Sequence, residues 1–425
     1  MPRAVVVGGA RTPFVRSFAE YTELDTIALG VLAVQGLLDR TGLDRAELDA
    51  VIWGGVVLPP TAPNTGREIA LDLGLPPAVE AYTVSRACAT GLQAVTDAVA
   101  KIERGEADVV IAGGSDSTSN APLTMPETLI RKVGPVAMSS KSGPMDWVKL
   151  LFKLSLKRDL LPKQPQIAER STGEVMGEAA EKMSQRNGVT REEQDVFAVA
   201  SHHKAAAAVE SGRFADEITP VTVKGKTVER DTMVRGNTST EKLAKLRAAF
   251  AKGGMLTAGN SSALTDGAAA VLIMSEEKAA ALGMRPLAAF KSWAYVGVDP
   301  ADQLLMGPAL AMPKALDRAG MQLGEVDVVD VHEAFAGQVL SVLKMLESDA
   351  FAQERLGKDA AVGAVDPAKL NPHGGSLALG HPFAATGARM VLTMAHELAD
   401  TDAETALLGI CAAGGLGAAA VMEAV

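Results

Sequence analysis

The sequence predicts an α/β protein with a substantially parallel sheet, and three observations support this fold class. Short runs rich in Val, Ile and Ala, such as residues 107–114 (ADVVIAGG), end in glycine turns and indicate buried strands. Amphipathic stretches alternate with them; one runs from Leu92 to Ile102 at helical spacing and ends at Gly105. The 425 residues are 48% hydrophobic but only 4% aromatic, which favours closely packed layers of helix and sheet.

The chain also repeats itself. Three pairs of segments match in the same order: residues 38–57 with 316–335, 89–91 with 385–387, and 107–114 with 404–411. Ordered matches of this kind predict a duplicated α/β unit, with one copy at each end of the chain.

The middle of the chain differs from both copies. It holds proline-bearing stretches and a charged helical run over residues 190–211, and long insertions commonly carry binding function. We therefore expect three parts: a first half made of residues 1–119 and 258–285, an inserted domain over 120–257, and a second half over 286–425.

Charge and cysteine content exclude several classes of protein. A formal charge of −10 argues against non-specific nucleic-acid binding, although a local basic patch can still bind an anionic substrate. Only two cysteines are present, far apart and in no CxxC pair, so we expect neither a disulfide framework nor a metal site. The chain has no apolar run of membrane-spanning length and no signal peptide at its start, which predicts a cytoplasmic protein.

Cys88 is the first candidate for catalysis. The predicted helix that follows begins at or just after it, and a thiol at a helix N-terminus meets the positive end of the helix dipole and free N–H groups. Both favour the thiolate, the nucleophilic form. An arbitrary cysteine is more often a buried small hydrophobe, so the assignment depends on the other motifs.

Three further segments place polar side chains beside turns. His381 lies in the glycine- and proline-rich run 371–382 (NPHGGSLALGHP), which lets the backbone approach a ligand and fixes the direction of the ring. Cys411 ends a predicted strand before a glycine-rich turn, where α/β sheets bind ligands. His332 and Glu333 follow another strand. Taken singly, each has a structural alternative as a core or loop residue.

Together these motifs resemble the thiolase family, over essentially the whole chain from residues 9–14 (GARTPF) to 411–417 (CAAGGLG). Residues 332–336 (HEAFA), in place of the commoner NEAFA, and 380–389 (GHPFAATGAR) look most like the thiolase subunits of bacterial and mitochondrial fatty-acid β-oxidation complexes. The resemblance implies the thiolase fold, a duplicated five-layered αβαβα arrangement with an inserted loop domain.

The resemblance also implies a reaction, thiolytic cleavage of 3-ketoacyl-CoA by CoA to acetyl-CoA and a shortened acyl-CoA. In it Cys88 is the nucleophile, His381 takes the thiol proton, and Cys411 is the acid and base at the α-carbon. His332 faces the enolate oxygen together with His381, where most relatives have Asn. The backbone N–H groups of Cys88 and Ala413 face the oxyanion of acyl transfer. CoA is the co-substrate, and no other cofactor is implied.

Two positions match CoA-contacting positions of the family. Arg235 corresponds to one near the nucleotide end, with a solvated surface charge as the alternative, and Ser262 to one near the pantetheine.

Residues 145–163 form a basic amphipathic segment that predicts a helix lying weakly on a membrane surface, docking a partner or covering the acyl tunnel. His202 and His203 lie on the charged helix and are expected to face solvent.

Several alternatives remain open at this point. An acetoacetyl-CoA thiolase working in the condensing direction carries the same motifs. A ketoacyl-ACP synthase is disfavoured because Cys411 lies on its glycine turn, and a non-catalytic thiolase-like lipid carrier because Cys88, His381 and Cys411 are all retained. The family implies a homodimer core, and the HEAFA form implies a partner subunit with hydratase and dehydrogenase activities.

Overall fold

The computed structural model describes residues 2–162 and 168–425. It divides the chain into two compact units: a main unit of residues 1–120 and 168–425, and a small unit of residues 121–167. We describe each unit by itself.

The main unit contains one mixed sheet and a separate small hairpin. Its strands are β1 (Ala4–Arg11), β2 (Val15–Arg16), β3 (Ala50–Gly54), β4 (Glu80–Val84), β5 (Val109–Asp116), β6 (Val221–Val223), β7 (Lys226–Val228), β8 (Thr265–Ser275), β9 (Ala288–Gly297), β10 (Val328–Val331), β11 (Thr405–Ala412) and β12 (Leu416–Glu423). The large sheet has the order β10-β11-β12-β9-β1-β8-β5-β3-β4, with β2 beside β8, and β6 pairs with β7. Among the strands described, the parallel pairs are β3 with β4, β3 with β5, and β10 with β11. The expectation of a substantially parallel sheet is thus wrong for its centre, where long strands return antiparallel.

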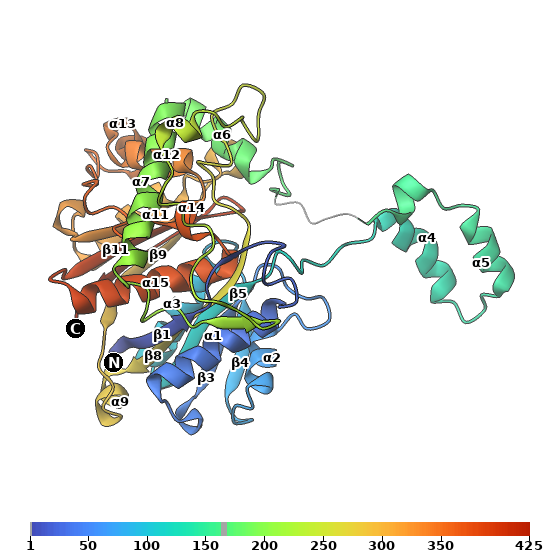
Figure 1. Cartoon of the computed structure of the whole chain (residues 1–425), viewed down its shortest axis with the longest axis horizontal. Helices are drawn as coiled ribbons and strands as arrows, with labels where there is room; N and C mark the ends of the chain where they lie inside the picture. Colours follow the sequence, from blue (N-terminus) through green and yellow to red (C-terminus); the bar gives the residue numbers. More distant parts are fainter. Residues whose placement is uncertain (1, 163–167) are drawn as a thin grey trace. The chain divides into compact units, whose positions relative to one another are not determined.

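Helices cover and separate the strands of the main unit (Figure 1). They are α1 (Thr26–Thr41), α2 (Thr65–Asp72), α3 (Thr90–Glu103), α6 (Met176–Arg186), α7 (Arg191–Glu210), α8 (Thr240–Leu243), α9 (Glu276–Ala281), α10 (Pro300–Gln303), α11 (Gly307–Ala319), α12 (Ala336–Leu346), α13 (Asp349–Phe351), α14 (Ser376–Leu379) and α15 (Phe383–Asp400). Short 3₁₀ turns lie at Arg45–Glu47 and Leu323–Glu325, and a π turn lies at Ala352–Leu356.

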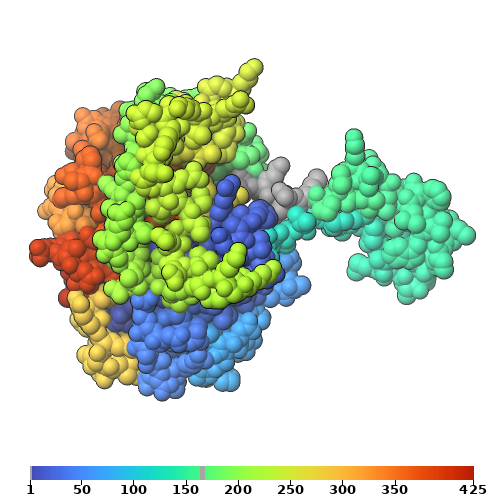
Figure 2. All heavy atoms as spheres, in the orientation of Figure 1, coloured from blue at the N-terminus to red at the C-terminus, as the bar shows by residue number. Residues whose placement is uncertain are grey.

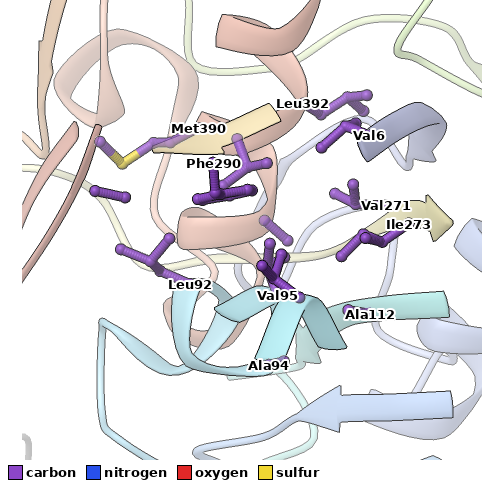
Figure 3. Packing of buried hydrophobic residues seen from close by; sticks show 14 of the residues in the cluster. Val6, Leu92, Ala94, Val95, Ala112, Val271, Ile273, Phe290, Met390 and Leu392 are labelled. Atoms are coloured by element: carbon purple, nitrogen blue, oxygen red, sulfur yellow. The ribbon is translucent and has the colours of Figure 1, made fainter. Parts of the chain in front are cut away.

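The buried apolar residues define five layers. One core, drawn in Figure 3, joins α3 and α15 to strands of both halves of the sheet, with Leu92 and Leu392 among its members. A second core packs α1 and α2 on the opposite face of β1, β3, β5 and β8. A third packs α11 and α12 against β9, β11 and β12. The α3–α15 layer is therefore central, as the αβαβα fold requires.

The sequence repeat corresponds to a repeated arrangement of strands. The order β3-β5-β8-β1 in the first half matches β10-β11-β12-β9 in the second, and the two sets meet where β1 pairs with β9. In each set the first strand lies parallel to the second, and the second pairs antiparallel with the third; the first half carries β4 in addition, parallel to β3 at the edge of the sheet. The central helices α3 and α15 are the equivalent helices of the two halves.

Glycine allows these two helices to touch at their N-terminal ends. A Cβ added to Gly91 on α3 would lie 2.4 Å from the carbonyl oxygen of Ala384, and one added to Gly387 on α15 would lie 2.3 Å from the backbone nitrogen of Leu92. Both distances are far below ordinary contact, so only glycine fits. This contact sets how closely the starts of α3 and α15 approach each other.

Most of the predicted insertion packs onto the main unit. The charged run at 190–211 forms α7 as expected; Thr190 caps it by accepting from the Glu193 N–H at 3.2 Å, and the Glu193 carboxylate accepts from the Thr190 N–H at 2.6 Å. The green and yellow segments that contain α7 and α8 lie over one face of the main unit in Figure 2. The rest of the insertion, residues 121–167, is assigned to the small unit.

The small unit is a helical hairpin of α4 (Glu127–Ala137) and α5 (Pro144–Leu151), followed by a π turn at Leu156–Leu160. A single helix over 145–163 is therefore wrong: α5 ends at Leu151, and residue 163 lies outside the described residues. Lys132 on α4 joins that helix to the π turn by donating to the Asp159 carboxylate at 2.7 Å. Twelve of the 19 exposed large apolar side chains in the described chain belong to this unit.

The contact between α3 and α15 predicts an intolerance to added side chains. Gly387→Ala should lower the free energy of unfolding by about 1–3 kcal/mol, because the methyl group forces the helices apart. Thermal or urea unfolding measures this. Gly324→Ala is the control, since a Cβ there meets no atom within 4 Å. Equal stability of the two variants would contradict the proposed tight contact.

Candidate active site

A tight turn presents Cys88 at the start of α3. The chain leaves β4 at Val84, and Ala87 takes a φ of 46°, a conformation that costs a non-glycine residue about 1–3 kcal/mol. Thr90 stabilises the turn, because its hydroxyl donates to the Ala87 carbonyl at 2.5 Å and accepts from the Arg86 N–H at 2.7 Å. The strained residue therefore directly precedes the thiol.

His381 is held at the start of α15, the equivalent place in the second half. Gly380 has a φ of 103°, and Leu264 forms a backbone bridge with His381. The Nδ1 atom of His381 lies 2.6 Å from the hydroxyl of Thr386, in the first turn of α15. Its Nε2 atom has no partner among the described residues.

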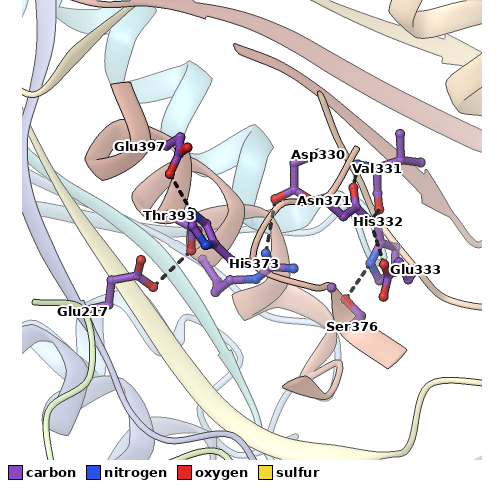
Figure 4. Close-up of polar contacts among 12 residues, drawn as sticks. Glu217, Asp330, Val331, His332, Glu333, Asn371, His373, Ser376, Thr393 and Glu397 are labelled. Carbon is purple, nitrogen blue, oxygen red and sulfur yellow. Dashed lines mark hydrogen bonds and ion pairs between the residues drawn. The ribbon is translucent and has the colours of Figure 1, made fainter. Parts of the chain in front are cut away.

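His332 follows β10 and has a similar support. Its Nδ1 lies 2.9 Å from the hydroxyl of Ser376, and its Nε2 has no partner within residues 2–162 and 168–425 (Figure 4). Both imidazoles thus direct one nitrogen to a hydroxyl group and leave the other free. Because a hydroxyl both donates and accepts, each ring can hold its proton on either nitrogen.

The structure brings the predicted catalytic residues together. The Cys88 sulfur and one ring nitrogen each of His332 and His381 all lie within 4.8 Å of one another. The two ring centroids are 4.2 Å apart. Cys411 is buried near the end of β11, close enough for charge on Cys88 to raise its pKa. The backbone N–H groups of Ala413 and Cys88 act to lower the pKa of the Cys88 thiol.

The resting site consists of neutral groups. Burial raises the pKa of the Cys88 thiol to about 11, although the N–H of Ala413 partly offsets this. Burial, followed by charge on Cys88, raises the pKa of Cys411 well above its usual range. Burial also lowers the pKa of His381 to about 3 and holds that of His332 well below its usual range, and the Arg389 guanidinium adds to both shifts.

The expectation that the helix start makes Cys88 a thiolate is wrong for the resting protein. Helix α3 begins at Thr90, two residues after the thiol, and desolvation outweighs the two N–H groups. Ionisation of Cys88 therefore needs a base that takes the proton, and a neutral His381 beside the sulfur can do so.

A buried carboxylate supports the histidine loop. Glu333 accepts from the Asn371 amide at 2.6 Å (Figure 4). It also accepts from the Ser201 hydroxyl at 2.6 Å and from the Leu377 N–H at 3.2 Å. Burial raises its pKa. These bonds fix the segment that carries Ser376. The sequence marked Glu333 only as a polar residue after a strand, and its partners come from segments that the motifs did not connect.

A second buried carboxylate joins the two halves beside Cys88. Asp116, at the end of β5, accepts from the N–H groups of Val56 and Val57 at 3.0 and 2.6 Å, and from that of Ala384 at 2.8 Å. Burial raises its pKa to about 7, and its charge raises that of Cys88. No motif indicated this residue.

The candidate CoA-binding residues lie in different settings. Ser262 is half-buried, and its N–H donates to the Ala334 carbonyl at 3.0 Å, beside the segment that carries His332. Arg235 is exposed, and its backbone N–H donates to His202 Nδ1 at 3.3 Å. His202 itself is buried, although the sequence predicted that it faces solvent. This burial lowers its pKa to about 4.

His203 and His373 contact protein groups outside the catalytic cluster. His203 is exposed, as expected, with Nε2 3.0 Å from the Thr238 carbonyl. His373 lies 2.6 Å from the Glu397 carboxylate on α15 (Figure 4). This contact explains the presence of a second histidine in the His381 loop without a catalytic role.

Comparison with known proteins defines the class. The model of the thiolase N-terminal domain matches residues 4–277, and that of the thiolase C-terminal domain matches residues 284–424. A protein named 3-ketoacyl-CoA thiolase from Serratia proteamaculans is 45% identical over 424 residues, covering 99% of this chain and 97% of that protein. One of the same name from Yersinia pestis is 44% identical with the same coverage. The chain therefore belongs to the thiolase family.

Solved structures agree with this assignment. Human mitochondrial 3-ketoacyl-CoA thiolase in complex with CoA superposes with a TM-score of 0.84 at 29% identity, covering 100% of this chain and 98% of that one. Bacillus anthracis acetyl-CoA acetyltransferase gives a TM-score of 0.83 at 32% identity, covering 100% and 99%. Within the described ranges, none of the helices has the length and apolar character needed to cross a membrane.

The raised pKa of Cys88 predicts how its alkylation depends on pH. The rate of iodoacetamide modification should still increase between pH 8 and 10, because the thiol is neutral at pH 7 and its pKa is about 11. Peptide mass spectrometry follows the modification, and Cys88→Ser isolates any reaction of Cys411. A rate that reaches its plateau below pH 8 would show instead that Cys88 is a resting thiolate.

Proposed function

We propose that this chain catalyses thiolytic cleavage of 3-ketoacyl-CoA by CoA, giving acetyl-CoA and a chain-shortened acyl-CoA in fatty-acid β-oxidation. The observation that carries the proposal is the meeting of Cys88, His381 and His332 at the junction of the two halves. Full-length relatives named 3-ketoacyl-CoA thiolase support the substrate. CoA binding is supported by the related structure that was solved with CoA.

In the first half-reaction, His381 takes the proton of Cys88 as the sulfur attacks the 3-keto carbon. The bond between the α- and β-carbons breaks and leaves acyl-Cys88. The enolate oxygen of acetyl-CoA accepts from the protonated His381 and from Nε2 of His332, which donates when its Nδ1 accepts from Ser376. Cys411 then gives its proton to the α-carbon, which a neutral buried thiol can do.

In the second half-reaction, the Cys411 thiolate takes the proton of the incoming CoA thiol. The CoA sulfur attacks acyl-Cys88, and the backbone N–H groups of Cys88 and Ala413 stabilise the oxyanion, a role supported by their effect on the thiol, whose pKa they lower. Cys88 leaves as a thiolate and regains its proton from His381. Both thiols and the histidine return to their neutral resting state.

We assign Ser262 to the pantetheine arm and Arg235 to the nucleotide end of CoA. Ser262 is supported by its bond to Ala334 beside the site, and Arg235 by an exposed guanidinium that makes no ion pair with any described residue. We further assign residues 1–119 with 258–285 and 286–425 to the two thiolase halves and 120–257 to the inserted domain. The family models, which meet near residue 280, support a boundary there.

We also propose a cytoplasmic enzyme with a homodimer core and a partner subunit with hydratase and dehydrogenase activities. The bacterial 3-ketoacyl-CoA thiolases among its relatives support this setting. Mass measurement of the chain, alone and co-expressed with such a neighbour, tests it. A monomeric mass for the chain alone would contradict the homodimer core. The absence of a complex on co-expression would contradict the partner subunit.

Thiolysis assays test the reaction. The purified chain should turn over a long-chain 3-ketoacyl-CoA faster than acetoacetyl-CoA, and it should consume more than one equivalent per active site only with CoA present. Cys411→Ser and His381→Asn should each lower kcat by about 10²–10⁴-fold, the usual contribution of a proton-transfer group. Without CoA, intact-mass analysis should find an acyl adduct that Cys88→Ser does not form.

The exposed His203 provides the control, because His203→Asn should retain full activity. No CoA-dependent loss of either substrate would refute the proposal. A preference for acetoacetyl-CoA, with faster condensation than cleavage, would favour the acetoacetyl-CoA thiolase instead.

We assign weak membrane-surface contact to the helical hairpin of residues 121–162. Its described part has seven basic and three acidic side chains, in a chain of net charge −10. Exposed apolar side chains on and after α5 include Leu151 at 69% and Phe152 at 88%. Exposed apolar groups beside basic ones match an anionic lipid surface.

Vesicle binding tests this assignment. The chain should co-sediment with vesicles containing anionic lipid, and the double substitution Leu151→Ser with Phe152→Ser should weaken binding about 10²–10⁴-fold, since each buried large apolar side chain contributes about 1.5–3 kcal/mol. Val196→Ser, at an exposed apolar residue of α7, is the control and should bind normally. Equal binding by both variants would exclude this surface.

A further inference from the structure

The arrangement of Cys88, His332 and His381 has a second chemical property. Their sulfur and nitrogen atoms lie within 4.8 Å of one another, although the residues come from three segments: the turn after β4, the end of β10 and the loop before α15. Zinc is typically held by thiolate and imidazole ligands, with about 2.3 Å to sulfur and 2.0–2.1 Å to nitrogen. The spacing of the two cysteines in the sequence gave no sign of this donor set.

Both histidines are prepared as ligands. His332 is 0% exposed and His381 is 6% exposed, and Nε2 of each has no partner among the described residues. In each ring the other nitrogen meets a hydroxyl group, Ser376 at 2.9 Å and Thr386 at 2.6 Å. A hydrogen bond to the non-ligating nitrogen is the usual support of a metal-bound histidine, because it fixes the ring and its tautomer.

We propose that Cys88, His332 and His381 bind a thiophilic divalent cation of the Zn²⁺ class, and that the bound cation inhibits the enzyme by occupying its nucleophile. Binding replaces the thiol proton: the S–H bond breaks, an S–Zn bond forms, and the proton leaves to solvent. The fourth tetrahedral position is left for a water molecule.

The geometry requires only small movements. Tetrahedral zinc places its sulfur and nitrogen ligands about 3.3–3.6 Å apart, so atoms that lie within 4.8 Å of one another need to close by at most about 1.5 Å. Rotation of the Cys88 side chain, which is partly exposed, allows this. Zn²⁺ binding depends on His332. With the Asn that is commoner in the family at this position, the cation would have only one sulfur and one imidazole as ligands, and an amide oxygen is a poorer ligand for it.

Metal binding and acylation exclude each other. The sulfur of acyl-Cys88 is a thioester and has no charge to offer the cation. By reciprocity, substrate that forms the acyl-enzyme displaces the metal, and the metal lowers the affinity for productive substrate. The site would therefore respond to free cation mainly when the enzyme is idle.

Metal titration of the resting protein tests the proposal. Competition with a chromophoric chelator should find one Zn²⁺ per chain, and Co²⁺ should give a thiolate-to-metal charge-transfer band. Cys88→Ala should abolish that band, and His332→Asn should weaken Zn²⁺ binding about 100-fold or more. Zn²⁺ should also protect Cys88 from iodoacetamide. His203→Asn, at an exposed histidine, should bind as the parent does.

The outcomes are separable from those of the activity assays, since no substrate is present. Absence of stoichiometric Zn²⁺ binding would overturn the proposal. So would binding that both Cys88→Ala and His332→Asn leave unchanged, because the metal would then lie elsewhere on the surface. Matching melting temperatures for the variants and the parent would show that any loss of binding does not arise from unfolding.

Discussion

The contact between the first turns of α3 and α15 is the constraint on which the site depends. Gly91 and Gly387 let the two helices approach with backbone against backbone. Cys88 precedes one helix and His381 precedes the other, so this approach sets the distance between nucleophile and base. Asp116 adds to the same junction by joining the end of β5 to the start of α15. The active site is therefore a property of the interface between two halves, not of either half.

Burial then determines the chemistry of the site. Four ionisable groups lie together, and desolvation keeps all of them neutral, with the thiol pKa raised and the imidazole pKa values lowered. A neutral site stores no ion pair that substrate binding would have to break. Charge appears only as a proton moves from sulfur to nitrogen, when the attacking thiolate and the new imidazolium stabilise each other.

Local patterns explain which features the sequence could predict. Some features depend only on residues close together in the sequence, and the structure has each of them. They are the repeat, the helices around Leu92 and Thr190, and the glycine turns at His381 and Cys411. Features that depend on tertiary surroundings could not be read in this way: the neutral state of Cys88, the burial of His202 and the support of Glu333 all arise from residues distant in sequence. The break after Leu151 was missed because an amphipathic pattern continues through a turn as easily as through a helix.

Thr90 and Thr386 occupy equivalent places in the two halves, each in the first turn of its central helix. Thr90 bonds to backbone groups and shapes the turn that presents a sulfur, whereas Thr386 bonds to an imidazole and orients its ring. One hydroxyl thus supports a nucleophile and its twin supports a base. The two halves of the duplicated unit therefore carry different groups at equivalent helix starts, a thiol in the first half and an imidazole in the second. Two identical halves could not have supplied both the donor and the acceptor of the same proton.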